Sequence, residues 1–502
     1  MQYIITAEEM KYYDSYTIEK TRIPSLLLME RAAMEMAGIV ERRVKKGDEI
    51  IVFAGTGNNG GDALAVGRML AEKGTAVAFY MPGERNKATA ETRKQLEILE
   101  NLGFSIHGNL PEKEYDIVID GLFGIGLKRE INGIYKEAVE KINDLKEKGA
   151  LVAAVDIPSG ICADSGRILG CGVKADMTVT FGYGKAGHYF YPGREYTGEL
   201  FVRDIGITKK ALDEKSPSYM TLCKEELKEL LPERKKWGNK GNFGKVLLYA
   251  GSFDMCGAAL LCGRSILRSG AGMVKIITPM ENRRIIQQAL PEAMLYTYEG
   301  MPDKDAVEQS LAWADVLVAG PGIGKGKAAR YLLEIFLKQG KKPMVIDADG
   351  LNLVAEEENL QKAVREYEKD KLIMTPHPGE LIRLSGQSME DYCQSPYRAV
   401  TRLADAFSCI LVGKDAVTLT AAPLKTTVYM NTTGNDGMAT AGSGDVLAGI
   451  IGGLLAQGLL GFRAACIGVG LHGAAGDRAA SKKGRYGMTA SDIIDEMCGI
   501  MR

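Results

Sequence analysis

A chain of 502 residues is too long for a single hydrophobic core, so two domains of ordinary size, or three, are expected. Its 63 Lys and Arg residues nearly balance its 64 Asp and Glu residues, and this balance argues against a nucleic-acid or membrane-surface role. Hydrophobic residues at 46% together with 60 glycines are typical of a soluble α/β enzyme with many tight turns.

The cysteines and the N-terminus bear on cellular location. The nine cysteines have no CxxC or CxxH spacing, so neither a zinc site nor a disulfide framework is expected. The opening residues, MQYIITAEEMKYYD, lack a basic head followed by an apolar stretch, and no apolar run is long enough to span a membrane. We therefore expect a cytoplasmic protein with reduced thiols.

Two amphipathic helices are predicted over residues 7–20 and 26–44, separated by Pro24. Their apolar residues recur at spacings of three and four. We assign both helices to the scaffold or to subunit contacts, and we expect a homo-oligomer.

The first glycine-rich loop follows a predicted buried strand over residues 49–54 and reads GTGNNGGDALAVGRML. It has neither the GxGxxG spacing of a dinucleotide site nor the GK[ST] of a Walker loop. A strand, a glycine turn and a helix in this order place a ligand at the carboxyl end of a strand. The residues of this loop that favour ligand contact over a plain turn are Asn58, Asn59, Gly60, Gly61 and Asp62.

Two further strand ends carry polar residues. The strand over residues 117–120 leads into DGLFGIGLKRE, in which Lys128 and Arg129 suit an anion such as phosphate. A later buried strand leads into VDIPSG. In a parallel sheet these ends converge on one rim, although each acid alone could be a helix cap. The side chains Asn59, Asp120 and Ser159 could hold a hard cation, and Asp156 could transfer a proton.

The three motifs GTGNNGGD, DGLFGIGLKRE and VDIPSG, in this order, resemble the NAD(P)HX epimerase domain of the YjeF N-terminal type over roughly residues 1–210. The resemblance implies a Rossmann-like three-layer α/β fold, interconversion of the R and S hydrates of NADH and NADPH, catalysis by Asp156, and potassium ligation by Asn59, Asp120 and Ser159. It implies substrate contacts at Asn58, Asn59, Gly60, Gly61, Asp62, Gly124, Ile125, Gly126, Leu127, Lys128, Arg129, Glu130 and Asp156. Ala63 departs from the family, which usually has glycine at this position.

A charged stretch over residues 207–236 contains no strand-like run and is interpreted as a linker. We place the boundary near Ser216, with domains at residues 1–215 and 216–502. Beyond it, strands are predicted before residue 251 and at 275–278, 315–319, 344–346, 372–374 and 410–413, with a helix beginning near Ala258. Strand, loop and helix alternate, which predicts a second α/β unit.

Several loops of this second unit could carry chemistry. In GPGIGKG, Gly322 and Gly324 fit a phosphate-contacting loop and a tight turn equally well. His377 lies between two prolines, which favours a ligand-contacting role on a loop. Lys414 and Thr418 provide a cation and a hydroxyl at a strand end, and these groups suit a nucleotide phosphate or ribose.

The stretch over residues 431–450, NTTGNDGMATAGSGDVLAGI, contains GSGD at a predicted helix N-terminus. Small residues there leave backbone N–H groups open to a phosphate. Asp445 is placed either to cap this helix or to act as a base toward a bound hydroxyl.

The order NKGxxG, AGS, GPGIG, DADGLN, TPHPGE, KDAVT and NDGMATAGSGDVLAG resembles the ADP/ATP-dependent NAD(P)HX dehydratase of the ribokinase-like superfamily, over about residues 216–502. The resemblance implies substrate contacts at Ala258, Gly322, His377 and Asp445, and nucleotide contacts at Lys414, Asp415, Ala416, Val417, Thr418 and Gly444. Asp415 replaces a glycine common in the family. An acid there repels phosphates unless it points away or meets magnesium.

Together the two resemblances imply a bifunctional repair enzyme that uses NADHX or NADPHX and ADP or ATP with Mg²⁺. It would epimerise the hydrates and dehydrate the S epimer by phosphorylating its hydroxyl, with Asp445 as the base. One alternative is a kinase of a small alcohol, such as a hydroxymethylpyrimidine or a thiazole alcohol, fused to a ligand-binding Rossmann-like domain. The other is a binding protein whose first half has lost catalysis.

Overall fold

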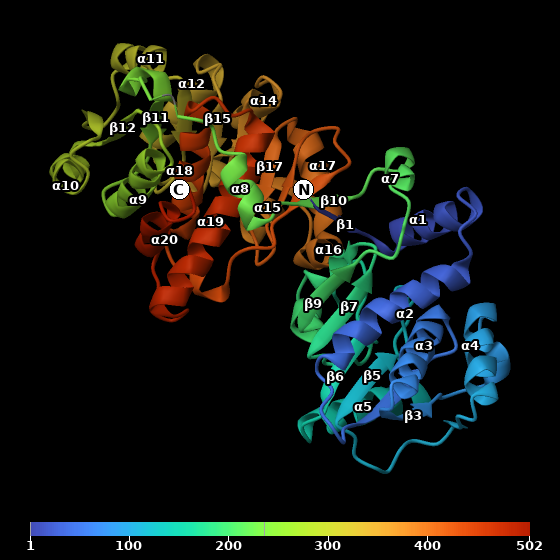
Figure 1. Cartoon of the computed structure of the whole chain (residues 1–502). Coiled ribbons are helices and arrows are strands. Elements are labelled where there is room, and N and C mark those ends of the chain that lie inside the picture. Colours follow the sequence, from blue (N-terminus) through green and yellow to red (C-terminus); the bar gives the residue numbers. More distant parts are fainter. Residues whose placement is uncertain (1, 235, 502) are drawn as a thin grey trace. The chain divides into compact units, whose positions relative to one another are not determined.

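The computed structural model describes residues 2–234 and 236–501. The chain forms two compact units, one of residues 3–219 and one that begins at Met220 (Figure 1). Among the described residues, no helix is both long and apolar enough to cross a membrane.

The N-terminal unit contains a twisted sheet in which all neighbouring strands of the described residues pair in parallel. Its strands, in spatial order, are β4 (Ile106–His107), β3 (Ala76–Tyr80), β2 (Glu49–Ala54), β5 (Ile117–Gly121), β6 (Leu151–Val155), β7 (Met177–Phe181) and β9 (Glu199–Arg203). Most strand residues are buried, as expected for apolar runs covered on both faces.

Helices cover both faces of this sheet. Alternate residues of β2 separate into two cores, because Ile50 and Val52 pack with one set of helices and Ile51 and Phe53 with another. The first set is α1 (Ala7–Glu19), α2 (Ser25–Glu41), α3 (Asn58–Glu72) and α4 (Ala90–Asn101), and the second is α5 (Ile134–Glu147). The expected Rossmann-like three-layer fold is confirmed.

The order of the strands reverses between β2 and β5, so the loops that leave these two strands turn away from each other. Ligands of doubly wound sheets bind in the crevice at such a point. The loops after β2 and β5 are the two glycine-rich motifs of the sequence. Beside this sheet, β1 (Gln2–Ile5) pairs in parallel with β8 (Gly184–Lys185).

The C-terminal unit contains a second sheet, parallel from β13 to β17 and antiparallel beyond it. Its spatial order is β13 (Met294–Tyr298), β12 (Met273–Pro279), β11 (Lys245–Tyr249), β14 (Val316–Ala319), β15 (Met344–Ile346), β16 (Leu372–Met374), β17 (Ile410–Gly413), β18 (Leu419–Ala421) and β19 (Val428–Met430). Here the order reverses between β11 and β14, which creates a second crevice.

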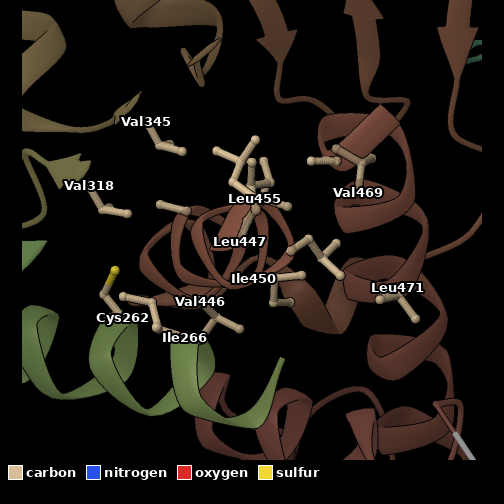
Figure 2. Packing of buried hydrophobic residues seen from close by; sticks show 14 of the residues in the cluster. Cys262, Ile266, Val318, Val345, Val446, Leu447, Ile450, Leu455, Val469 and Leu471 are labelled. Carbon is tan, nitrogen blue, oxygen red and sulfur yellow. The ribbon is translucent and has the colours of Figure 1, made fainter. Parts of the chain in front are cut away.

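One face of this sheet packs on α9 (Cys256–Arg268), α18 (Ser443–Ala456), α19 (Gly461–Lys483) and α20 (Ala490–Met497). Figure 2 shows Val318 and Val345 of the sheet facing α18 residues. On the other face, Tyr249 of β11 packs against Phe336 of α12 (Lys327–Gln339). Other helices of this unit are α10 (Arg283–Ala289), α11 (Lys304–Trp313), α13 (Asp349–Glu356), α14 (Glu358–Arg365), α15 (Pro378–Ser385), α16 (Met389–Gln394) and α17 (Pro396–Phe407), and a short helix, α6 (Gly193–Thr197), belongs to the N-terminal unit.

Glycines allow α18 to approach its neighbours closely. A side chain at Gly449 would overlap the Ser265 hydroxyl and the Cys262 carbonyl of α9. A side chain at Gly452 would lie 2.5 Å from Val318 on β14. The helix is therefore held tightly between α9 and the sheet, which fixes the position of its N-terminus.

The prediction of a strand-free linker over residues 207–236 was wrong. This stretch contains α7 (Lys210–Glu214), β10 (Tyr219–Thr221) and α8 (Lys224–Glu229), while Lys235 lies outside the described residues. Several of its apolar residues, including Tyr219 and Leu227, are buried. These elements are short, and one buried side chain per turn is enough to fix each of them. The charged stretch therefore contains no apolar run from which a strand or a helix could be predicted.

Candidate active sites

A cavity of about 750 Å³ lies in the N-terminal unit, at the carboxyl ends of β2, β5 and β6. The glycine-rich loops after these strands form much of its wall. The residues expected to contact substrate that line it are Asn58, Asn59, Asp62, Gly124, Ile125, Gly126, Leu127, Lys128, Arg129 and Asp156. A volume of this size accommodates a nucleotide-sized ligand.

Three residues expected at this site do not line the cavity. Gly60 and Gly61 are buried in the first turn of α3, where side chains would overlap the Gly55 backbone and Met29 respectively. Their role is to let the helix start pack closely. Glu130 is exposed beyond the end of the loop, because the chain has already turned toward solvent there.

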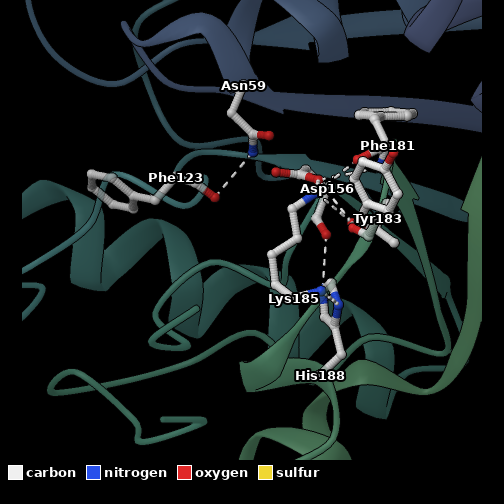
Figure 3. Close-up of polar contacts among 8 residues, drawn as sticks. Asn59, Phe123, Asp156, Phe181, Tyr183, Lys185 and His188 are labelled. Atoms are coloured by element: carbon white, nitrogen blue, oxygen red, sulfur yellow. Dashed lines mark hydrogen bonds and ion pairs between the residues drawn. The ribbon is translucent and has the colours of Figure 1, made fainter. Parts of the chain in front are cut away.

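Asp156 is the most constrained residue of this site. Its backbone has φ of 62°, a strained left-handed conformation for an aspartate. Its carboxylate accepts hydrogen bonds from Lys185 Nζ at 2.5 Å and from Thr180 Oγ1 at 2.9 Å (Figure 3). Burial alone would raise the pKa of Asp156, but the Lys185 ammonium outweighs it, and the pKa is lowered. Asp156 is therefore an ionised base.

His188 fixes the backbone beneath this carboxylate. The Lys185 N–H donates to His188 Nδ1 at 3.0 Å, so Nε2 carries the proton and donates to the Asp156 carbonyl at 2.9 Å. Burial, and then the Lys185 charge, lower the pKa of His188 to about 4 and keep the ring neutral. Sequence reasoning missed Lys185 and His188, although the polar residues of GKAGH after a buried strand were an available signal.

The three expected cation ligands lie together. Asp120 and Ser159 are fully buried, and Ser159 donates to Asp120 from its hydroxyl at 2.6 Å and from its N–H at 2.8 Å. Asn59 Nδ2 donates to the Phe123 carbonyl at 3.0 Å, which leaves the amide oxygen of Asn59 free to act as a ligand (Figure 3). Burial raises the pKa of Asp120 to about 6, although hydrogen bonds from Ser159 favour its charged form.

Two more aspartates line the cavity. Asp62 projects from α3, and Asp14, which sequence reasoning missed, projects from α1. Burial raises the pKa of Asp14 to about 7 and raises that of Asp62 well above its ordinary value. No motif marked Asp14, because it belongs to an ordinary amphipathic helix.

Ala63, the departure from the expected glycine, is fully buried in α3. It faces Gly121, where any side chain would overlap the Ala63 methyl group. The absence of a side chain at Gly121 therefore makes room for the Ala63 methyl group, which fits without displacing the glycine-rich loop after β2.

In the C-terminal unit, α18 begins at Ser443, with Gly442 as its N-cap at φ of 86°. The predicted helix start at GSGD is confirmed. A side chain at Gly444 would come within 3.2 Å of Lys414 Nζ and 3.6 Å of Asp347 Oδ2. The first-turn N–H groups of a helix lack partners within it, so this end faces the ends of the strands as an anion site.

Asp347 and Lys414 form a buried ion pair in front of α18, and sequence reasoning did not single out Asp347. Its carboxylate accepts from Lys414 Nζ at 2.5 Å and from Thr375 Oγ1 at 2.8 Å. Burial opposes the charge of Lys414, but the carboxylates of Asp347 and Glu380 outweigh it, so the pKa of Lys414 is raised. Lys414 is therefore a permanent cation.

Carboxyls outnumber cations around this pair. Burial, and then the charge of Asp347, raise the pKa of Asp445 to about 7, while Lys414 opposes this effect. Burial likewise raises the pKa of Glu380 to about 7. Asp445 can therefore gain and lose a proton near neutral pH.

Of the remaining substrate residues expected here, Gly322 and His377 lie in the loops after β14 and β16, and Ala258 lies in the first turn of α9. A side chain at Gly322 would lie 2.9 Å from the Ala258 methyl group, so the loop after β14 touches α9. His377 caps α15, and its Nδ1 accepts from the Gly379 N–H at 3.0 Å while half of the side chain stays exposed. Burial, and then the charge of Lys414, lower the pKa of His377 and keep the ring neutral.

The acid of the nucleotide stretch after β17 is held by hydrogen bonds from a tyrosine hydroxyl and from the next backbone N–H group. Asp415 Oδ2 accepts from the Tyr392 hydroxyl at 2.9 Å, and Oδ1 accepts from the N–H of Ala416 at 2.7 Å. The side chain of Val417 is buried, so only its backbone can meet a ligand. Among the described residues, no group of three or more His, Cys, Asp or Glu side chains is arranged to hold a metal by itself.

Family models match both halves of the chain. The model described as YjeF-related protein N-terminus covers residues 25–187, and the model described as NAD(P)H-hydrate dehydratase covers residues 246–498. Each match contains the strand-end loops that build one of the two sites.

Full-length relatives join the two halves in the same order. The bifunctional NAD(P)H-hydrate repair enzyme Nnr of Moorella thermoacetica is 35% identical over 100% of this chain and 97% of its own length. The chain belongs to the family of bifunctional NAD(P)H-hydrate repair enzymes. Family members similar to it include those of Thermofilum pendens, 34% identical over 99% of this chain and 96% of its own length, and Escherichia coli, 34% identical over 89% and 84%.

Solved structures match the dehydratase half of this family. A ribokinase-like superfamily protein of Enterococcus faecalis is 29% identical, with a TM-score of 0.51, and covers 57% of this chain and 95% of its own. A protein of Streptococcus mutans gives 29% identity and a TM-score of 0.50, over 56% of this chain and 100% of its own. The expected ribokinase-like fold of the C-terminal unit is confirmed.

Proposed function

We propose that residues 1–215 form an epimerase domain that interconverts the R and S hydrates of NADH and NADPH, and that residues 216–502 form a dehydratase domain. The dehydratase would act on the S hydrate with ADP or ATP and yield NAD(P)H, AMP or ADP, and phosphate. Family membership supports both activities. The observation that carries the proposal is the position of Asp445, in the first turn of α18 and beside the buried Lys414–Asp347 pair.

The dehydratase reaction needs a better leaving group than hydroxide. Asp445 takes the proton of the ring hydroxyl, whose oxygen then attacks the terminal phosphorus of the nucleotide. The first-turn N–H groups of Gly444 and Asp445 stabilise the charge on the transferred phosphoryl group. Phosphate leaves with the electrons of the C–O bond, and loss of a ring proton restores the double bond.

Nucleotide contacts are assigned to Gly444 and to residues 414–418, of which Val417 would contribute only its backbone. Magnesium prefers oxygen ligands, and the carboxylates of Asp347 and Glu380 would hold it with the phosphates. When bound, the ion neutralises charge on the phosphoryl oxygens. Substrate contacts are assigned to Ala258, Gly322 and His377, which lie on the strand ends and helices around Asp445.

The epimerase site is assigned to the cavity around Asp156, which would act as the base. Potassium would be held by the oxygens of Asn59, Asp120 and Ser159, a donor set that suits a hard monovalent cation. When bound, it would offset the charge of the buried Asp120 carboxylate. Substrate contacts are assigned to Asn58, Asn59 and Asp62 and to residues 124–129, all of which line the cavity.

The test is to incubate hydrated NADPH with the whole protein and either ADP or ATP, and to follow the absorbance of the reduced nicotinamide ring. We expect recovery of this absorbance with at least one nucleotide, together with release of phosphate. No recovery with either nucleotide would refute the dehydratase assignment. A stable phosphorylated product formed from a small alcohol would support the kinase alternative instead.

A further inference from the structure

Three aspartates from three different elements line the N-terminal cavity. Asp14 comes from α1, Asp62 from the first turns of α3, and Asp156 from the end of β6. A single fully buried cation, Lys185, lies among them in the described part of the chain. The negative groups therefore outnumber the buried positive charge.

The hydrogen bonds of Lys185 show which carboxyl it neutralises. Its Nζ donates to Asp156 Oδ1 at 2.5 Å, to Thr180 Oγ1 at 2.8 Å and to the Phe181 carbonyl at 3.0 Å (Figure 3). An ammonium group has three N–H donors, and all three are used. Lys185 consequently holds Asp156 ionised and has no donor left for Asp14 or Asp62.

Asp14 and Asp62 receive no compensating hydrogen bond from any described residue. Burial favours the neutral form of Asp14; the charge of Lys185 opposes this effect, and the smaller effect of the Asp156 charge supports it. Burial, and then the charge of Asp156, favour the neutral form of Asp62, although Lys185 partly opposes this effect. The other charged residues that line the cavity are Lys11, Glu91, Lys128 and Arg129. The three cations among them are exposed, so water screens their effect on Asp14. A neutral carboxyl thus shares the cavity with an ionised one.

Epimerisation of a nicotinamide hydrate needs this combination of groups. Water adds to the ring double bond with its oxygen on the carbon next to the ring nitrogen, because the nitrogen lone pair stabilises a cation there. Inversion at that carbon requires the C–O bond to break and water to add from the opposite face. The departing oxygen needs a proton, and the incoming water must lose one.

We propose that Asp14 is a catalytic residue of the epimerase, giving its proton to the departing hydroxyl while Asp156 accepts a proton from the incoming water. This inference rests on the proposed function of the N-terminal unit. The C–O electrons leave with the oxygen as water, and the nitrogen lone pair forms a C=N⁺ bond. The incoming oxygen then bonds to the same carbon, and the C=N electrons return to nitrogen. Proton exchange with solvent restores both carboxyls.

This assignment gives α1 a role that no motif or family model indicates. Asp14 lies before residue 25, where the match to the YjeF-related model begins. The helix is nonetheless anchored as an active-site element would be, by the capping pair of Thr6 and Glu9 and by the hydrogen bond from Tyr13 to the Lys215 carbonyl at 2.9 Å.

The test uses the full chain and a single purified hydrate epimer, with its approach to the R and S equilibrium followed by chromatography. Asp14→Asn keeps the size of the side chain but cannot donate a carboxylic proton, so kcat should fall by about 10²- to 10⁴-fold with little change in KM. Asp14→Glu should restore part of the rate. The matched control is Glu19→Gln, a similar change at an exposed position on the same helix, and it should leave the rate unchanged.

The pH profile separates catalysis from a structural role. Because the pKa of Asp14 is about 7, the wild-type kcat should fall as the pH rises above that value, and Asp14→Asn should lose this fall. Dehydratase activity and the melting temperature of each variant report on folding. If Asp14→Asn does not fold, the pH above which kcat decreases is compared between Asp14→Glu and the wild type. A change in this pH supports the proposal, and an unchanged value overturns it.

Two failures can be distinguished. If the wild-type protein does not speed epimerisation beyond the spontaneous rate, the proposed function of the N-terminal unit is wrong. If the wild-type protein does so and Asp14→Asn retains both its rate and its pH profile, the role of Asp14 alone is refuted.

Discussion

Replacing Asp445 by asparagine should abolish dehydration and at the same time stabilise the C-terminal unit. The pKa of Asp445 is raised from 3.8 to about 7 by burial and by the neighbouring Asp347. The folded state therefore binds this proton more tightly than the unfolded chain does. Ionisation destabilises the fold, and its cost grows as the pH rises from about 4 to about 7.

The size of this cost follows from the pKa. Since one pKa unit corresponds to about 1.4 kcal/mol, ionised Asp445 costs the folded state at most about 4 kcal/mol above pH 7. The partial exposure of Asp445 and the charge of Lys414 reduce the realised value, and we expect about 1–2 kcal/mol. Asparagine at this position carries no charge and avoids the cost.

The assay combines two measurements on the same preparations. Dehydration of the S hydrate with ADP or ATP should fall by about 10²- to 10⁴-fold in Asp445→Asn. Its melting temperature should exceed that of the wild type at about pH 8 and match it at about pH 4. The control Asp495→Asn changes an exposed aspartate on α20 and should alter neither property. Full activity in Asp445→Asn, or a lower stability at about pH 8, would refute this reasoning.

Three other changes test the packing and the charge arrangement. Gly449→Ala should destabilise the C-terminal unit by about 1–3 kcal/mol in urea unfolding, because the methyl group overlaps Ser265; no loss would mean that α9 and α18 can separate freely. Lys185→Met should unpair a buried carboxylate and destabilise the N-terminal unit by about 3–5 kcal/mol, with epimerase activity lost and dehydration of purified S hydrate retained. Loss of both activities would contradict that separation. Asp415→Ala should keep the KM for ADP or ATP within about twofold of the wild-type value, because the carboxylate is hydrogen-bonded to Tyr392. A much lower KM in the variant would show that Asp415 repels the nucleotide.

Much of each site could be predicted because its residues follow strands directly. The apolar runs at 49–54 and 117–120 are the observed β2 and β5 strands or lie within them, and the loops after them meet where the strand order reverses. The start of α18 at Ser443 was equally predictable, since small residues before an apolar helical run indicate a helix N-terminus. Local pattern was sufficient in these places because the ligand-binding geometry is local.

The failures of sequence reasoning concern contacts between distant residues. Lys185 bonds Asp156 across 29 positions, and Lys414 bonds Asp347 across 67, so no spacing within one motif could reveal either pair. Asp14 looked like any polar residue of an amphipathic helix. The linker prediction failed in the same way, because burial of Leu227 depends on the surface that covers it.

The sequence by itself determined the two α/β units, the strand-end loops that carry the chemistry and the family to which they belong. These features depend on hydrophobic period, glycine position and motif order, all of which are written along the chain. Only the tertiary structure decided the charge state of each site. Whether a carboxyl is ionised depends on its burial and on whether a cation lies within hydrogen-bond distance. Here Lys185 forms an ion pair with Asp156, whereas Asp14 has no such partner and its pKa is raised.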